Sequence, residues 1–176
     1  MLAAGRIFGD EVSSTAPVFL AFLAVHVLSG MASVLTGAVT ALTPKGGRIH
    51  VRVGRVFFWA ITVVFASGTA LAAMRLREDW YLFLIGAVAW TAAWIGVRHR
   101  RRRRPGDTVH IIGMGMGYVA MVTAFYVDNG PQLPMGSRLP TLAFWLIPSA
   151  IGVPIIALSV MMRARHARSI PETREA

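Results

Sequence analysis

Five long stretches of the sequence are almost continuously apolar and lack the polar stripe at helical spacing that marks a soluble amphipathic helix. They cover roughly residues 16–42, 56–74, 80–97, 109–127 and 141–162, and none holds an Asp, Glu, Lys or Arg in its interior. A helix needs about 20 residues to cross the hydrocarbon core of a bilayer. The pattern therefore predicts five membrane-spanning helices.

Two other interpretations of these stretches fit less well. A lipid-facing β-barrel would alternate apolar and polar residues, whereas the stretches are continuous. The first stretch is also longer than the core of a secretory signal, which is about 7–15 residues. In lipid, backbone hydrogen bonds close within each segment only in a helix. We expect an all-α fold, with residues 1–176 forming a single integral membrane domain built as a five-transmembrane-helix bundle.

The segments that connect the stretches differ sharply in charge. Segments 43–55, 98–108 and 163–176 hold 14 of the 18 Lys and Arg residues, and the opposite side holds the other four together with five of the eight acids. Cytoplasmic loops of membrane proteins carry an excess of basic residues. The alternation predicts an N-terminus outside and a C-terminus in the cytoplasm, in a multi-pass protein of a cytoplasmic membrane.

Composition narrows the possible chemistry. The chain is 55% hydrophobic and 15% charged and has no cysteine, which excludes a disulfide scaffold, a zinc–thiolate site and a thioether-attached haem. The arginine run 100–104 predicts a loop that holds topology against anionic lipid headgroups, and we expect no nucleic-acid partner. No phosphate loop, metalloprotease motif or hydrolase triad order is present, and whether a reaction is catalysed is left open.

Small residues repeat every four positions in three of the predicted helices, a spacing that permits close helix approach in membranes. They are Ser29, Ser33 and Gly37 in the first, Gly68 and Ala72 in the second, and Gly113 and Gly117 in the fourth. The repeats predict a core made of the first, second and fourth helices.

Three histidines are candidate cofactor ligands. His50 and His110 stand at a matching depth on the basic side, and two imidazoles meeting across a bundle can bind haem b or a divalent metal ion. His26 lies deep in the first span, where it is either a cofactor or relay residue or a structural residue bonded to Ser29 or a backbone carbonyl. It lies roughly 24 Å from the basic side, which is too far for His26 and His110 to bind the same haem iron.

Two further groups of residues have both a chemical and a structural interpretation. Arg48, Arg52 and Arg55 recur near helical spacing and could grip a phosphate, a carboxylate or an anionic lipid headgroup, or simply extend to the membrane surface. Methionines in the fourth span could bind haem or copper, but methionine in an apolar helix more often fills the core. They are Met114, Met116 and Met121.

Several of these residues together resemble a known family. They are His26, the segment His50-Val-Arg-Val-Gly54-Arg55, and the segment from His110 through Gly113-Met-Gly115-Met-Gly117-Tyr118 to Asp128-Asn129-Gly130. In this respect the chain is similar to bacterial predicted multi-pass membrane proteins described as domain of unknown function 2306. The resemblance would cover the chain from the first span to the fifth. It implies a protein of the bacterial inner membrane and brings no established activity.

Three functions stay open at the level of the sequence. The first is a cofactor-binding membrane protein that uses His50 and His110. The second is a small transporter or channel subunit with His26 as a polar relay. The third is a non-catalytic assembly factor that works through a homo-oligomer or a membrane-complex partner.

Overall fold

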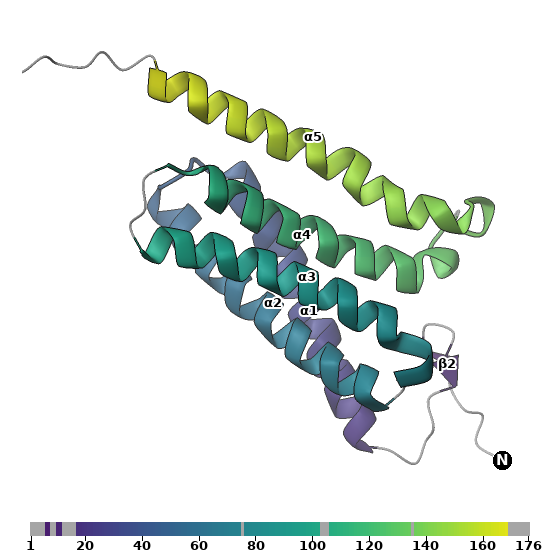
Figure 1. The fold of residues 1–176 in the computed structure, drawn as a ribbon. Helices are drawn as coiled ribbons and strands as arrows, with labels where there is room; N and C mark the ends of the chain where they lie inside the picture. The colour runs from purple at the N-terminus through teal and green to yellow at the C-terminus, as the bar shows by residue number, and fades with distance from the viewer. Residues whose placement is uncertain are drawn as a thin grey trace, which may run out of the picture.

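A computed structural model describes residues 6–7, 10–11, 17–74, 76–102, 106–134 and 136–168 of the chain. Five long helices dominate it: α1 (Pro17–Leu42), α2 (Arg48–Met74), α3 (Leu76–Arg101), α4 (Thr108–Asn129) and α5 (Thr141–Arg168). Two short strands, β1 (Arg6–Ile7) and β2 (Asp10–Glu11), pair antiparallel before α1, and two 3₁₀ turns, η1 (Gly130–Gln132) and η2 (Gly136–Arg138), join α4 to α5. The predicted all-α fold is confirmed (Figure 1).

All five helices are long and apolar enough to cross a membrane, so the chain is a multi-pass integral membrane protein. The main difference from expectation lies at the start of α2, which begins at Arg48, eight residues before position 56. The arginines between these positions interrupt the apolar pattern but not the helix, because hydropathy marks only the part of a helix that lies in lipid. His50 is therefore a first-turn helical residue and not part of a loop.

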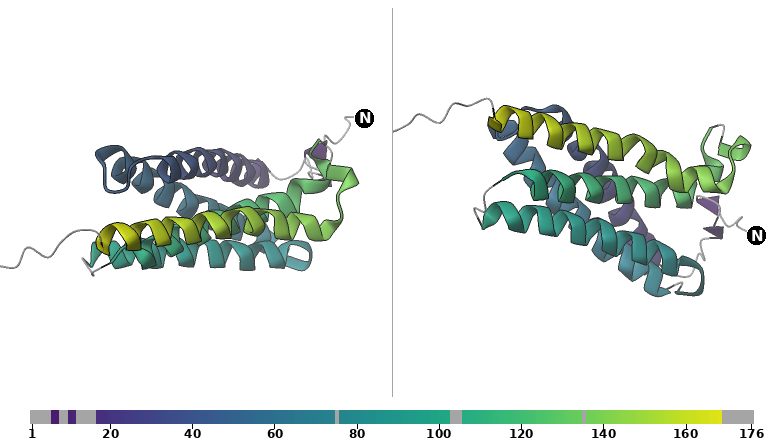
Figure 2. Two further views of the ribbon diagram at one scale, coloured as in Figure 1. Left: turned by 90° about the horizontal axis from the view of Figure 1, so that it is seen from above. Right: turned by 45° about the horizontal axis from the view of Figure 1, so that its top comes forward.

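Consecutive helices pack against one another, α1 on α2, α2 on α3, α3 on α4 and α4 on α5 (Figures 1 and 2). Helix α1 also meets α4 at one narrow place, where the ring of Tyr118 occupies the space above Gly37. Helix α5 lies along α4 at the edge of the bundle (Figure 2). The buried core sits between α2, α3 and α4, around Phe57, Ile61 and Ala93.

The predicted core of the first, second and fourth helices is wrong. The small face of α4 packs on α3: a Cβ atom on Gly113 would lie 2.6 Å from the carbonyl oxygen of Ala92, and one on Gly117 would lie 2.8 Å from that of Ala89. Spacing shows that a helix has a small face, but not which neighbour covers it. Here α3 supplies its own small residues, Ala89, Ala93 and Gly96, to the same seam.

Large apolar side chains cover the outside of the bundle. Leu28 and Leu35 of α1, for example, are 68% and 64% exposed. In water such a surface would drive aggregation, whereas in a bilayer it is the surface that contacts lipid tails. The lipid bilayer is therefore the first partner of this protein.

Candidate functional site

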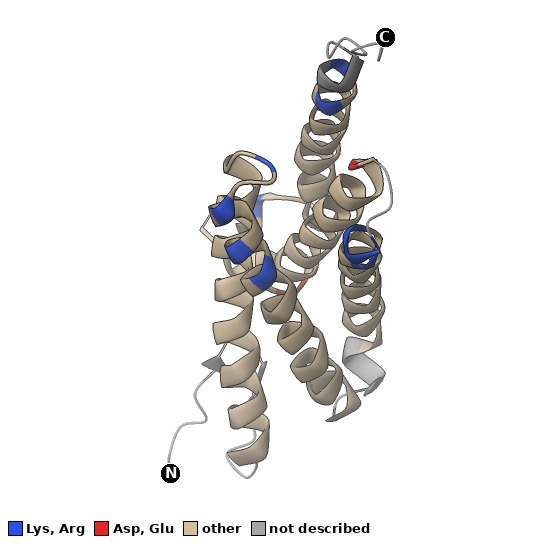
Figure 3. Cartoon of the chain, turned by 90° about the vertical axis from the view of Figure 1, so that its left-hand side faces the viewer, with Lys and Arg blue, Asp and Glu red and all other residues tan. Residues whose placement is uncertain are grey.

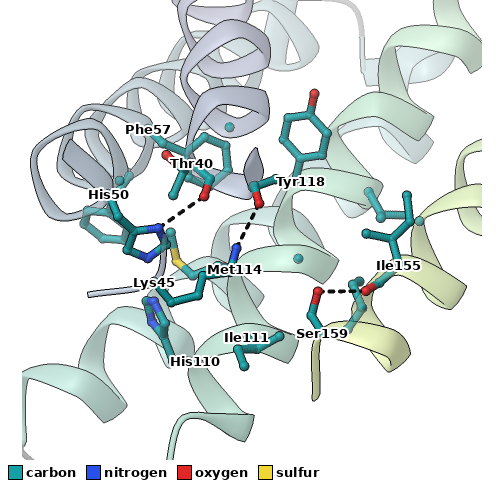
Figure 4. Close-up of a pocket in the computed structure, with 18 of the residues that line it drawn as sticks. Thr40, Lys45, His50, Phe57, His110, Ile111, Met114, Tyr118, Ile155 and Ser159 are labelled. Carbon is teal, nitrogen blue, oxygen red and sulfur yellow. Dashed lines mark hydrogen bonds between the residues drawn. The ribbon is translucent and has the colours of Figure 1, made fainter. Parts of the chain in front are cut away.

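One large cavity, of about 640 Å³, opens between α1 and α2 on one side and α4 and α5 on the other. Most of its wall is apolar, with Phe57 from α2, Ile111, Met114 and Val119 from α4, and Ile155 from α5. Figure 4 shows His50, Met114 and His110 on one side of it and Ile155 and Ser159 on the other. The cavity lies between α1, which packs on α2, and α5, which packs on α4.

The cavity is long as well as large. Along α4 its lining runs from Asp107 to Tyr126, a distance of about 29 Å at the usual helical rise. Along α5 it runs from Ile147 to Arg163. Helices α1 and α2 line only one half, through residues such as Thr40 and His50. The cavity is therefore an apolar groove that extends along the helices and ends among polar side chains.

His50 and His110 lie at the matching depth that the sequence predicts, and their rings approach each other at the polar end of the groove. Their ring centroids are 6.4 Å apart and the rings are nearly perpendicular, at 72°. The Nδ1 atom of His50 lies 3.1 Å from the carbonyl oxygen of Thr40 in α1, and that of His110 lies 3.1 Å from the carbonyl oxygen of Gly96 in α3. Each imidazole is thus held by a helix other than its own.

These two hydrogen bonds define what each imidazole can offer to a ligand. A carbonyl oxygen only accepts, so Nδ1 of each ring carries the proton and donates it. In a neutral ring Nε2 then keeps a lone pair, which can accept a hydrogen bond or bind a metal. The arrangement is the one that orients histidine ligands in metal sites, and it serves equally to orient two hydrogen-bond acceptors.

Five cationic side chains line the same end of the cavity, which we call the basic end: Lys45, Arg55, Arg100, Arg101 and Arg163. They come from the α1–α2 connection, from α2, from the end of α3 and from the end of α5, and Figure 3 shows how these segments gather at one end of the bundle. The N-termini of α2 and α4 and the C-termini of α1, α3 and α5 all lie at this end, so the helix dipoles largely cancel and the side chains set its charge. The potential at this end favours anions.

Asp107 is the one acidic side chain that lines the cavity among the described residues. Its carboxylate accepts a hydrogen bond from Arg163 Nε at 2.7 Å and pairs with the guanidinium of Arg100. Burial alone would raise the pKa of Asp107, but the Arg163 hydrogen bond and the charges of Arg100, Arg163 and His110 outweigh it and hold that pKa below its usual value. Asp107 thereby ties α3 to α5 and shows that an oxyanion fits between the two arginines.

The side chain of Lys45 is hydrogen-bonded to the protein although the residue as a whole is exposed. Its Nζ atom donates to the carbonyl oxygen of Ala41 at 3.0 Å. Partial burial lowers the pKa of its ammonium group. After Asp107 is counted against the five cations, the basic end keeps a clear positive excess.

Other predicted site residues lie elsewhere. Of the three arginines before the second span, Arg55 lines the cavity, whereas Arg48 and Arg52 are exposed and lie outside its lining. His26 is a helix–helix contact: its Nδ1 atom lies 3.1 Å from the carbonyl oxygen of Val64 and 3.2 Å from Ser67 Oγ, both in α2. Val64 is 14 residues beyond His50 on α2, about 21 Å along the helix, so His26 does not join the pair.

The three methionines of the fourth span lie in different environments in the structure. Met114 lines the cavity beside the histidines, and Met121 is buried in the core. Met116 is 37% exposed on the outside of α4. Within the described ranges, no group of three or more His, Cys, Asp or Glu side chains gathers as a metal-holding cluster.

Sequence reasoning did not assign Lys45, Arg100, Asp107 or Arg163 to a site. Only Asp107 has a visible signal in the sequence, because it is a single acid at the end of a loop otherwise filled with arginine. Arg163 comes from a helix far along the chain, and its approach depends on how α5 lies on α4.

No protein-family model, curated protein or solved structure matches this chain. The resemblance to the family described as domain of unknown function 2306 therefore stays a prediction.

Proposed function

We propose that this protein binds an anionic amphiphile from the membrane, with the hydrocarbon chain in the apolar groove and the charged head at the basic end. The observation that carries the proposal is the continuity of the two parts. One cavity, about 29 Å long along α4, joins an apolar wall to a cluster of five cations and two histidines. By the charge bias of the loops, we place the basic end at the cytoplasmic face of the membrane.

The size and shape of the groove support a chain-like occupant. Ligand pockets commonly measure about 300–1,000 Å³, and the volume of about 640 Å³ falls in that range. A pocket of this volume stretched along a whole helix is narrow, which suits a hydrocarbon chain better than a compact solute. Because α1 and α5 diverge, such a molecule could enter sideways from the bilayer.

The charge at the basic end supports an anionic head. In a membrane interface, several cations around one cavity are costly unless an anion or water compensates them. Asp107 compensates Arg100 and Arg163 in part. An anionic head at this place would neutralise part of the remaining excess.

The experiment blocks the groove and follows retention of the amphiphile. In native mass spectrometry of protein extracted in a mild detergent, we expect a bound anionic amphiphile at close to one per chain. Ile151→Trp places a large ring on the α5 wall of the groove and should lower occupancy about tenfold. Leu158→Trp, on α5 but outside the lining, is the matched control and should keep wild-type occupancy. Equal occupancy in both variants, or none in the wild type, contradicts the proposal.

A second candidate function is favoured by the histidine pair alone. Metal–nitrogen bonds are about 2.0–2.1 Å long, so two imidazoles whose centroids lie about 6 Å apart would both be able to hold one metal ion. The observed separation is 6.4 Å. We keep haem b between His50 and His110 as this candidate, because its anionic propionates would meet Arg100 or Arg163. A free divalent ion would enter against five cations.

An absorption spectrum tests the second candidate. Protein produced with ample haem should show a Soret band that His50→Ala and His110→Ala both abolish, while His99→Ala keeps it. Metal analysis of the same preparations tests the divalent ion. A spectrum without a Soret band, together with no bound metal, removes the second candidate and leaves the first untouched.

A further inference from the structure

The hydrogen-bonding capacity of the basic end specifies more than a negative charge in the ligand. Arginine and lysine side chains only donate, so a ligand must bring acceptor oxygens to Arg100, Arg163 and Lys45. In their neutral form the two imidazoles commit their N–H groups to Thr40 and Gly96, so each Nε2 then only accepts. A ligand head that satisfies both sets must carry acceptor oxygens and a proton to donate, close together.

We infer, resting on the proposed function, that the head is a terminal phosphate, a monoester or diphosphate at the end of a lipid chain. A terminal phosphate has a second pKa of about 6, so near neutral pH it carries about −1.5 to −2 charges and exchanges one proton readily. Its unprotonated oxygens can accept from the arginines and Lys45, and its P–OH can donate to the Nε2 atom of His50 or His110. Proton transfer from the phosphate to an imidazole would turn the same contact into a charge-assisted hydrogen bond.

Other common anionic heads satisfy only part of this set. A carboxylate near neutral pH has two acceptor oxygens and no proton, and it carries one charge. A phosphodiester also carries one charge, and its phosphoryl group has no P–OH. After Asp107 is counted, the cations at the basic end outnumber a single negative charge. A terminal phosphate balances the charge more closely, and its P–OH can donate to one of the two histidines.

The position of Asp107 supports the geometry. Its carboxylate is held by Arg100 and Arg163, which come from α3 and α5. An oxyanion is thus already accommodated between these two helices, on the side of the cavity where His110 lies in the first turn of α4. A terminal phosphate has three oxygens outside its ester bond, enough to reach an arginine, Lys45 and a histidine together.

The test compares lipids that differ only in the head. Full-length protein is reconstituted in phosphatidylcholine nanodiscs, and binding is measured for phosphatidate, phosphatidylglycerol and a free fatty acid of the same chain. We expect phosphatidate to bind at least about tenfold more tightly than either of the others. The double variant His50→Phe, His110→Phe should lose most of this preference, while His99→Phe and Arg52→Gln, outside the cavity, should keep it.

The outcomes separate the two proposals. Binding of all three lipids without a preference for phosphatidate overturns the terminal-phosphate inference and leaves the amphiphile proposal standing. Binding of none overturns both. Inorganic phosphate, added alone, should compete only weakly; competition as strong as that of phosphatidate would mean a site for free phosphate and would overturn the lipid assignment. If the double variant does not fold, the single variant Arg163→Gln, expected to weaken phosphatidate about tenfold, replaces it.

Discussion

The two long faces of α4 show how one helix serves opposite purposes. On the face toward α3, Gly113 and Gly117 let backbones approach so closely that a Cβ atom on either would meet a carbonyl oxygen. On the face toward α1 and α5, His110, Met114 and Tyr118 stand at the wall of an open groove. The first face is covered by α3, whereas the second contacts α1 at Tyr118 and α5 at Gly115 and lines the groove between them. A close-packed seam beside a groove gives the groove a rigid wall.

The largest effect on stability should come from disrupting the packing of α4 against α3. Gly113→Leu puts a side chain where the carbonyl oxygen of Ala92 and the backbone of Gly96 already lie, so α3 and α4 must separate. Overpacking of this kind typically costs about 1–3 kcal/mol, and because backbone and not a flexible side chain is in the way, we expect about 3 kcal/mol. Reversible unfolding in mixed micelles measures it.

The control for this variant is Gly30→Leu on α1, where nothing lies within 4 Å of the added Cβ atom. It should change the free energy of unfolding by less than about 0.5 kcal/mol, as surface substitutions usually do. If both variants unfold alike, the contrast between a closed and an open face is wrong.

The second effect concerns His26, the deep histidine that sequence leaves between structure and function. His26→Leu removes its hydrogen bonds to the carbonyl oxygen of Val64 and to Ser67. Side-chain hydrogen bonds between membrane helices average about 0.6 kcal/mol and reach about 1.7. We therefore expect a loss of about 1 kcal/mol in stability, with binding of phosphatidate unchanged. A loss of binding with normal stability would instead make His26 part of the ligand site.

Much of the architecture could be predicted from the sequence, because lipid forces every backbone hydrogen bond to close within its own segment. That constraint predicts the five helices and the matching depth of His50 and His110, since depth in a membrane is a coordinate that hydropathy reports. Lateral packing has no such reporter. The neighbour of Gly113, the divergence of α1 from α5 and the approach of Arg163 to Asp107 depend on which helix faces which.

The boundary of α2 illustrates the same limit on a smaller scale. Arg48 and Arg52 look like loop residues in a hydropathy pattern, yet they continue the helix beyond the apolar stretch. That extension turns His50 into a first-turn residue and brings Arg55 to the cavity. From the sequence alone, Arg48, His50 and Arg55 are predicted to lie outside the second span.

The smallest expected effect is a pH dependence of stability that involves Asp107, which lines the groove. Asp107 is only 17% exposed at its side chain, whereas Arg100 and Arg163 are about half exposed, so solvent screens the ion pairs and limits their contribution to about 1 kcal/mol or less. Because the pKa of Asp107 is lowered in the folded protein, this stabilisation is present above the unfolded value of about 3.9 and is lost as pH falls through the folded value. Asp107→Asn should therefore unfold slightly more easily than wild type at pH 7, and the difference should vanish in acid.

The same variant tests whether Asp107 only links α3 to α5 or also competes with the ligand for Arg100 and Arg163. If Asp107 occupies the place of a phosphate, its neutral replacement frees Arg100 and Arg163 and removes a like charge, so phosphatidate should bind about two- to fivefold more tightly at pH 7 even though the protein is less stable. Arg52→Gln, which changes the net charge at the same end without touching the cavity, should alter neither the pH dependence nor the affinity by a comparable amount. Weaker binding by Asp107→Asn would mean that the carboxylate positions the arginines for the ligand and does not compete with it.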